Sequence, residues 1–256
     1  MNKEKILNMT LFAVFASFIL ILGLVPNLGY ITIVPGASIT IIHIPVLVGI
    51  MFLPLAYSVA LGGVFGLTSF IASFIYAKSV IDFAFQNPLI SVLPRILFAI
   101  IAYFIFHALK YLFSKLKHEK VISFITIALF SLLFGFFVSR ALESITNWDI
   151  TAIYIIIGAI ILTLLILFYY FLSQEKYKNL MHIPTVFIVS TLFHSALVLL
   201  AIAIFKPLAF GTEDVFGVII TVLTTNSLVE ALAAFLIGSP IVVALTNLKE
   251  NKETKI

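Results

Sequence analysis

Apolar runs long enough to cross a bilayer recur throughout the sequence, and short polar or proline-containing breaks separate them. A transmembrane helix needs about 20 predominantly apolar residues. The pattern predicts eight spans, near residues 6–25, 42–55, 58–76, 93–114, 121–140, 150–172, 184–205 and 216–246. The second is short, and the last contains Gly238 and Pro240. We therefore expect an all-α, polytopic membrane protein with a single integral membrane domain over 1–256.

The composition supports this class and excludes several others. Hydrophobic residues make up 62% of the chain and charged residues 10%, which leaves no room for a soluble domain of ordinary size. The chain has no cysteine, so disulfides, thiolate chemistry and cysteine-based metal sites are excluded. Residues 6–25 are too long for the apolar core of a signal peptide, and we expect them to be a retained helix.

The basic residues divide unevenly between the two sides that eight spans would create. Eleven of the fifteen fall on the side of the termini, namely Lys3, Lys5, Lys110, Lys115, Lys117, Lys120, Lys176, Lys178, Lys249, Lys252 and Lys255. The other side carries Lys78, Arg95, Arg140 and Lys206. By the positive-inside rule, this asymmetry predicts a plasma-membrane protein with both termini in the cytoplasm. The positive net charge is spread over loops and tails, so we expect no nucleic-acid binding.

The last predicted span carries a carboxylate, Glu230, at membrane depth. Asn226 lies four residues earlier and therefore shares its helical face. An ionisable group within the hydrocarbon costs several kcal/mol unless it is paired, protonated or facing a polar cavity, and such groups are functional by default. The alternative is a packing role, with Glu230 bonded to a neighbouring hydroxyl.

An amide and a guanidinium lie close to the start of the fourth predicted span, at Asn87 and Arg95. Pro94 suits a first helical turn and places Arg95 near the outer interface. Arginine can grip a carboxylate with two hydrogen bonds, so an acidic substrate would fit. The alternative is an interfacial anchor that reaches towards water.

Two histidines, His43 and His194, lie at the start of the second span and within the seventh. A buried histidine is commonly a hydrogen-bonded packing residue, and this alternative stays open for both. Neither shows the spacing of a metal site, so we predict no metal and no cofactor. ATP-binding and protease motifs are absent as well, so uphill transport would need energy from elsewhere.

The first span has one smooth side, on which Ala13 and Ser17 are four residues apart. Small residues at this spacing permit close helix approach in lipid. Two uses remain open, namely packing within the protein and docking onto a partner protein. A similar pattern at Gly62, Gly63 and Gly66 of the third span favours internal packing.

Together these segments resemble the substrate-binding membrane subunit, or S component, of an energy-coupling factor vitamin transporter, nearest to the pantothenate and folate type. The matching stretches are Ile-Thr-Ile-Ile-His-Ile-Pro-Val at 39–46 followed by Gly49, Gly-Val-Phe-Gly-Leu-Thr-Ser at 63–69, Asn-Pro-Leu-Ile-Ser-Val-Leu-Pro-Arg-Ile-Leu at 87–97, Thr-Asn at 225–226 and Glu-Ala at 230–231. The resemblance covers about 1–114 and 184–248. The stretch at 87–97 is its most specific part.

The resemblance implies a subunit that binds a water-soluble vitamin on the extracellular side. A separate transmembrane coupling protein and two cytoplasmic ATPases would then reorient it, with Ala13 and Ser17 as the docking surface. The implied substrate-binding residues are Thr40, His43, Asn87, Arg95, His194, Ser195, Thr225, Asn226 and Glu230. Pantothenate, which carries a carboxylate, an amide and two hydroxyls, is favoured over folate or B6-type vitamins.

The chain departs from this family in two places. Members usually have six spans, so residues 115–183 look like an inserted helical hairpin with its loops. His194 and Ser195 stand where the family pattern has an asparagine and a threonine, which leaves the vitamin open. Two other functions compete with the transporter subunit. They are an intramembrane lipid-modifying enzyme that uses His194 with Glu230 or Arg95, and an ion-coupled secondary carrier.

Overall fold

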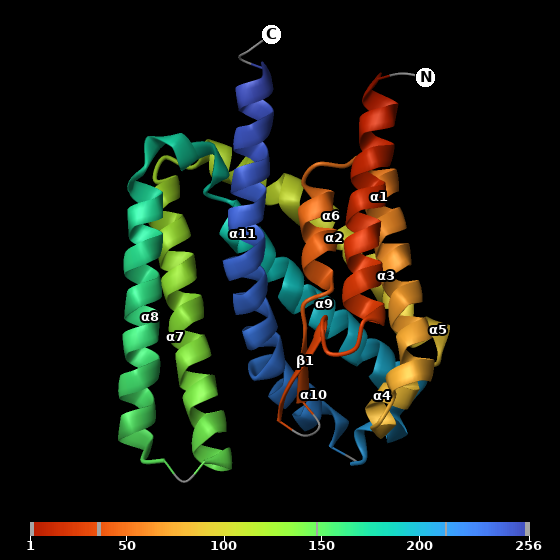
Figure 1. Ribbon diagram of the computed structural model, residues 1–256. Coiled ribbons are helices and arrows are strands. Elements are labelled where there is room, and N and C mark those ends of the chain that lie inside the picture. The colour runs from red at the N-terminus through yellow and green to blue at the C-terminus, as the bar shows by residue number, and fades with distance from the viewer. Residues whose placement is uncertain (1–2, 35–36, 147, 213, 254–256) are drawn as a thin grey trace. The chain divides into compact units, whose positions relative to one another are not determined.

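The computed structural model describes residues 3–34, 37–146, 148–212 and 214–253, and these form helices and one short hairpin (Figure 1). The α-helices are α1 (Lys3–Leu24), α2 (His43–Ile50), α3 (Leu55–Tyr76), α4 (Val80–Ala84), α5 (Pro88–Ser91), α6 (Leu93–Lys115), α7 (Glu119–Ile145), α8 (Ile150–Ser173), α9 (Ile183–Phe205), α10 (Val215–Thr224) and α11 (Asn226–Glu253). The antiparallel strands are β1 (Tyr30–Val34) and β2 (Ala37–Thr40), and 3-10 turns cover η1 (Glu175–Leu180) and η2 (Pro207–Phe210).

Seven helical stretches within the described residues are long and apolar enough to cross a membrane, and α2 with its last turn is a shorter apolar helix. Each of the eight predicted spans corresponds to one of these stretches. The protein is therefore a multi-pass helical membrane protein, as the hydrophobic pattern predicts.

The chain forms two compact units. The first, which we call the core unit, comprises Met1–His107 and Phe187–Ile256, and the second, the hairpin unit, comprises Ala108–Val186. In the hairpin unit, α7 and α8 pack against each other. Ile127, Phe130, Ile153 and Ile161 are buried there. Whether this unit is an insertion into a six-helix core stays a prediction.

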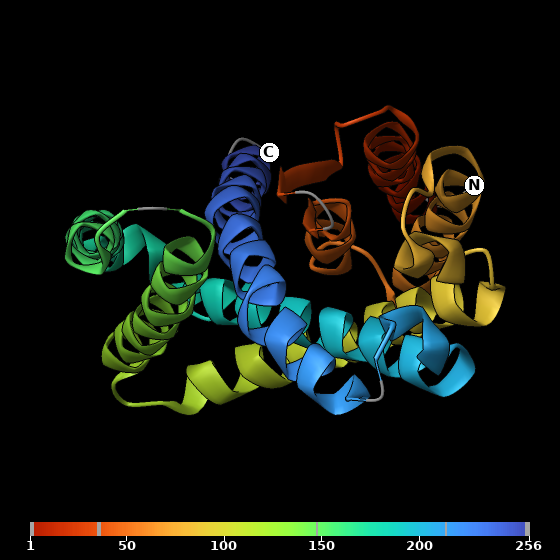
Figure 2. The ribbon, with the colours of Figure 1, turned by 90° about the horizontal axis from the view of Figure 1, so that it is seen from below.

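Helix α2 lies in the middle of the core unit, and all eight of its residues are buried. It packs against α1, α3 and α11, and its His43 contacts α9, which passes beside it in the view of Figure 2. Such a helix needs no polar face, which explains its nearly continuous apolar sequence. The prediction of a span over 42–55 was too long, because the helix ends at Ile50 and the chain turns before Pro54 to begin α3.

Small residues on α3 allow it to approach α5 and α6 closely. A Cβ atom added at Gly66 would lie 2.7 Å from the Cα of Val92, and one added at Gly62 would lie 2.7 Å from the backbone oxygen of Arg95. Neither obstacle is a flexible side chain, so both positions require glycine. These glycines therefore serve internal packing, and they set the position at which α6 presents Arg95.

Two local features differ from the predicted pattern. The single span expected over 216–246 is interrupted at Thr225, whose backbone (φ −113°, ψ −81°) separates α10 from α11. The β1–β2 hairpin occupies a stretch that we expected to be a loop. Apolar periodicity misses both features, because a break of one residue and two strands of five and four residues leave the average hydropathy around them unchanged.

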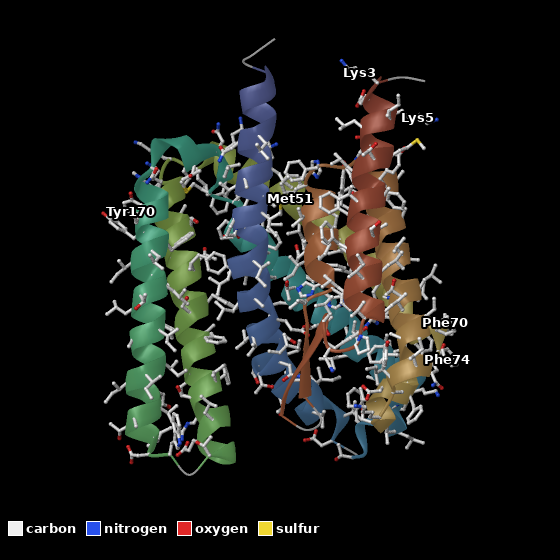
Figure 3. The ribbon with its side chains drawn as sticks, viewed as in Figure 1. Lys3, Lys5, Met51, Phe70, Phe74 and Tyr170 are labelled. Atoms are coloured by element: carbon white, nitrogen blue, oxygen red, sulfur yellow. The ribbon has the colours of Figure 1, made fainter. Side chains whose placement is uncertain are left out.

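Within the core unit, the beginning of α1 and the end of α11 lie at one end. The β1–β2 hairpin, α4 and α10 lie at the other end (Figure 1). Lys3 and Lys5 mark the first of these ends, while Phe70 and Phe74 project outwards from α3 (Figure 3). Phe74 is 60% exposed, as expected of a side chain that faces lipid. The assignment of the first end to the cytoplasm stays a prediction.

Candidate binding site

Four ionisable side chains from four helices are buried inside the core unit. The exposed fractions are 0% for His43 of α2, 6% for Arg95 of α6, 4% for His194 of α9 and 8% for Glu230 of α11. Charged and polar groups at such depth are costly, and they usually mark a pathway or a binding site. The four residues are separated widely in the sequence, and the helix packing of the core unit brings them together.

Glu230 links three elements through its two carboxylate oxygens. The backbone N–H of Thr40 donates to Oε1 (2.8 Å), and the Ser195 hydroxyl donates to Oε2 (3.2 Å). Thr40 ends β2, so the first bond ties the hairpin to α11. Ser195 lies on α9, directly after His194. The expectation of a bond between Glu230 and a neighbouring hydroxyl is thus realised, and the same carboxylate also fastens the hairpin.

The two buried histidines stack on each other. Their ring centroids are 5.5 Å apart and their planes differ by 11°. Nε2 of His43 lies 3.1 Å from the hydroxyl of Thr191, one turn before His194 on α9. The rings of Phe65 and Phe98 also contact His194, at centroid distances of 5.4 and 4.8 Å. Aromatic packing thus fixes the orientation of the His194 ring.

Arg95 is held by its backbone neighbours and by two aromatic rings. Its Nη1 donates to the backbone oxygen of Ile90 (2.7 Å), and its guanidinium carbon lies 4.8 Å from the ring centroid of Phe85 and 5.6 Å from that of Phe65. Within the described chain, no carboxylate lies at ion-pair distance from this guanidinium. A buried cation held by aromatic faces, with no direct ion pair among the described residues, is suited to bind an anion.

The interpretation of Arg95 as an interfacial anchor does not fit this position. An anchoring arginine extends its charged end to water, whereas Arg95 is 6% exposed. The close approach of α3 at Gly62 and Gly66 covers the first turn of α6 and keeps Arg95 from water. The expectation that Arg95 lies near the outer interface stays a prediction.

Tyr30, the first residue of β1, lies near the cluster without having been predicted. Burial raises the pKa of its phenol above the usual value, while the positive charge of Arg95 acts in the opposite direction. The phenol therefore stays protonated at neutral pH and can donate a hydrogen bond. Tyr30 pairs with Thr40 across the hairpin, so this strand pair brings a tyrosine and the Glu230 contact to the same place.

Three further predicted residues have local structural roles. The side-chain oxygen of Asn87 caps α5 by accepting from the backbone N–H of Leu89 (3.0 Å). The hydroxyl of Thr225 donates to the backbone oxygen of Thr221 (2.7 Å) at the break between α10 and α11. Asn226 is the first residue of α11 and is half-buried. Their contact with a substrate stays a prediction.

Sequence reasoning missed several members of the cluster. Thr191, Phe65 and Phe98 contact the two histidines, and Phe85 covers Arg95. Thr191 was detectable, because it precedes His194 by three residues and therefore shares its face of α9. The phenylalanines were not detectable, since the chain contains 26 of them and no spacing distinguishes these three.

The cluster offers hydrogen-bond donors, a cation and a carboxylate in an apolar surround, which is the usual lining of a small-molecule site. Nowhere in the described ranges do three histidine, aspartate or glutamate side chains gather as a metal would require. The two nitrogens of His194 form no hydrogen bond with Glu230 or Arg95. The acid–base pair that the enzyme alternative needs is therefore not assembled in this conformation.

Ala13 and Ser17, the predicted docking residues, both lie on an exposed side of α1. The Ser17 hydroxyl donates to the backbone oxygen of Ala13 (2.8 Å), so the serine adds little polarity to that side. Packing within the described part of the protein thus leaves both residues uncovered.

Comparison with known proteins gives one partial similarity. No family model matches the sequence. Over 103 residues, or 39% of this chain, the sequence is 35% identical to the pantothenate transporter PanT of Leuconostoc mesenteroides, and the match covers 50% of that protein. The chain thus spans about half the length of this curated relative, and the similarity is limited to that segment.

Proposed function

We propose that this protein is the substrate-binding membrane subunit of a vitamin importer, with pantothenate as the favoured substrate and folate or a B6-type vitamin as alternatives. The observation that carries the proposal is the buried, unpaired guanidinium of Arg95 beside polar groups of His43, His194 and Glu230. Pantothenate is an anion with several hydrogen-bonding groups, so it complements this set. The partial similarity to a pantothenate transporter supports the same choice.

The binding site comprises the polar cluster and its margins. Arg95 pairs with the carboxylate of the vitamin, and the remaining contacts come from Thr40, His43, Asn87, His194, Ser195, Thr225, Asn226 and Glu230. The β1–β2 hairpin covers the site, because the Thr40–Glu230 hydrogen bond holds it against α11. Substrate enters from the extracellular side when this hydrogen bond opens.

The energy for uptake comes from other subunits in this proposal. A transmembrane coupling protein docks on the exposed side of α1 at Ala13 and Ser17, and two cytoplasmic ATPases drive the cycle. Support for this arrangement comes from the lack of a nucleotide-binding motif and from the small, uncovered side chains of α1. The hairpin unit is an insertion into the binding subunit, and both termini are cytoplasmic.

The test is direct binding to the purified full chain. Isothermal titration in detergent with pantothenate, folate, pyridoxine and the other common B vitamins should give saturable binding of one compound, pantothenate first. Mass spectrometry of the freshly purified protein should detect the same compound. If no vitamin binds and none co-purifies, the substrate-binding function is wrong. Gradient-driven uptake by the chain alone in liposomes would instead favour a secondary carrier.

A further inference from the structure

Four buried nitrogen atoms of the cluster have no hydrogen-bond partner within the described structure. They are Nδ1 of His43, both ring nitrogens of His194 and Nε of Arg95. Leaving a buried polar group without a hydrogen-bond partner destabilises the folded protein. Native proteins satisfy nearly all such groups, so several orphans in one cluster point to a partner that completes them.

Two of the three side chains that carry these nitrogens, Arg95 and His194, lie against the same aromatic ring, that of Phe65. Phe65 lies 5.4 Å from the His194 ring and 5.6 Å from the guanidinium carbon of Arg95, measured from its own centroid. The ring of His43 stacks on the ring of His194. One small molecule beside Phe65 would therefore be near both the guanidinium and the imidazole of His194.

The hydrogen-bonding capacity of these groups restricts the ligand. Nε of Arg95 can only donate, and a neutral imidazole carries one N–H donor and one bare nitrogen that can only accept. Both nitrogens of His194 are free, so one of them needs a ligand group that donates a hydrogen. A carboxylate has acceptors alone. A ligand with only a carboxylate would thus leave a nitrogen of His194 unsatisfied.

His43 is restricted differently. Its Nε2 already shares a hydrogen bond with the Thr191 hydroxyl. If Nε2 donates in that bond, Nδ1 is an acceptor, and if Nε2 accepts, Nδ1 is a donor. The stacked His43 ring helps to hold His194 in place. The demand for a donating ligand group therefore falls on His194.

Resting on the proposed function, we infer that His194 recognises a hydroxyl group of the substrate, while Arg95 binds the carboxylate of the same molecule. A hydroxyl fits because its hydrogen rotates towards whichever imidazole nitrogen is bare. The substrate class is thus a hydroxylated carboxylic acid, and plain carboxylic acids of similar size are rejected. Rejection follows because binding them leaves the buried acceptor unpaired.

The experiment compares three probes on the full-length protein by isothermal titration. They are pantothenate, N-(3,3-dimethylbutanoyl)-β-alanine, which lacks both hydroxyls, and pantothenol, in which a hydroxymethyl group replaces the carboxylate. The wild-type protein should bind pantothenate at least about tenfold more tightly than the probe without hydroxyls. His194→Phe, which keeps an aromatic ring and removes both nitrogens, should reduce that ratio to below about threefold.

Two controls separate recognition from general damage. In His194→Phe, the preference for pantothenate over pantothenol should persist, because that preference reports on Arg95. His194→Asn retains a donor and an acceptor and should keep much of the hydroxyl preference. His107→Phe changes an exposed histidine and should alter neither ratio. If His194→Phe does not remain monodisperse, His194→Met takes its place.

The outcomes distinguish the two proposals. Tight pantothenate binding with an unchanged hydroxyl preference in His194→Phe, or with no such preference in the wild-type protein, would overturn the role of His194 and leave the proposed function standing. Failure of the wild-type protein to bind pantothenate or any other B vitamin would overturn both.

Discussion

The core unit and the hairpin unit use apolar sequence for opposite purposes. In the core unit, apolar helices bury Arg95 and Glu230, two groups that lipid alone would not tolerate. In the hairpin unit, the segments 121–139 and 150–174 contain no charged residue, and large side chains of α8 such as Ile155 (67% exposed) face outwards. Among the described residues, the buried guanidinium and the buried carboxylate both lie in the core unit, so we place recognition there.

The largest expected effect comes from removing the unpaired cation of the core unit. Arg95→Ala should weaken pantothenate binding by at least about tenfold, or about 1.4 kcal/mol, because a charge-assisted hydrogen bond is lost. Isothermal titration measures the change. Arg140→Ala, in the exposed part of α7 where Arg140 pairs with Glu143 at 3.0 Å, is the matched control and should bind normally. Equal affinities of the two variants for pantothenate would show that Arg95 does not contribute to binding.

Glu230→Ala tests whether Glu230 holds the β1–β2 hairpin against α11. The Thr40 N–H and the Ser195 hydroxyl would lose their acceptor, so the hairpin should open more readily. We expect hydrogen exchange of the Thr40 amide of β2 to accelerate by at least roughly severalfold, since a hydrogen bond contributes about 0.5–1.5 kcal/mol. Glu143→Ala should leave that exchange unchanged. Equal protection of β2 in both variants would show that other contacts hold the hairpin.

A pair of glycine substitutions compares packing in the two units. Gly66→Ala should destabilise the protein, because the new methyl group would lie 2.7 Å from the Cα of Val92. Gly158→Ala in α8 meets nothing within 4 Å and should be neutral or stabilising by up to about 1 kcal/mol through helix propensity. Thermal unfolding in detergent measures both. A Tm of Gly66→Ala at or above that of Gly158→Ala would contradict this packing.

A pH-dependent effect is expected at His182, which precedes α9 in the hairpin unit. Burial, followed by the nearby charge of Lys110, lowers the pKa of His182 from 6.5 to about 4. The unfolded chain therefore binds a proton between these values that the folded chain does not, and stability falls as the pH decreases from about 6.5 to 4. His182→Gln should flatten the Tm profile over this window. The control His118→Gln, at an exposed histidine, should leave the dependence of Tm on pH unchanged.

Sequence reasoning located most of the buried ionisable groups, because an ionisable residue within an apolar run is conspicuous. It identified Arg95, Glu230, His43 and His194 before any fold was known. It could not identify Phe65 or Thr191, whose importance depends on which helices become neighbours. It also overestimated the length of α2 and missed the break at Thr225, since hydropathy averages over many residues and hydrogen-bond geometry does not.

The sequence by itself determined that this is a multi-pass helical membrane protein, because the bilayer demands apolar runs of a fixed length. It also determined which residues would be costly to bury. Only the tertiary structure decided that those residues meet, that Glu230 fastens the β1–β2 hairpin, and that neither nitrogen of His194 has a hydrogen-bond partner in the described part of the chain. Such facts depend on distances between segments up to 190 residues apart, and no local pattern encodes these distances.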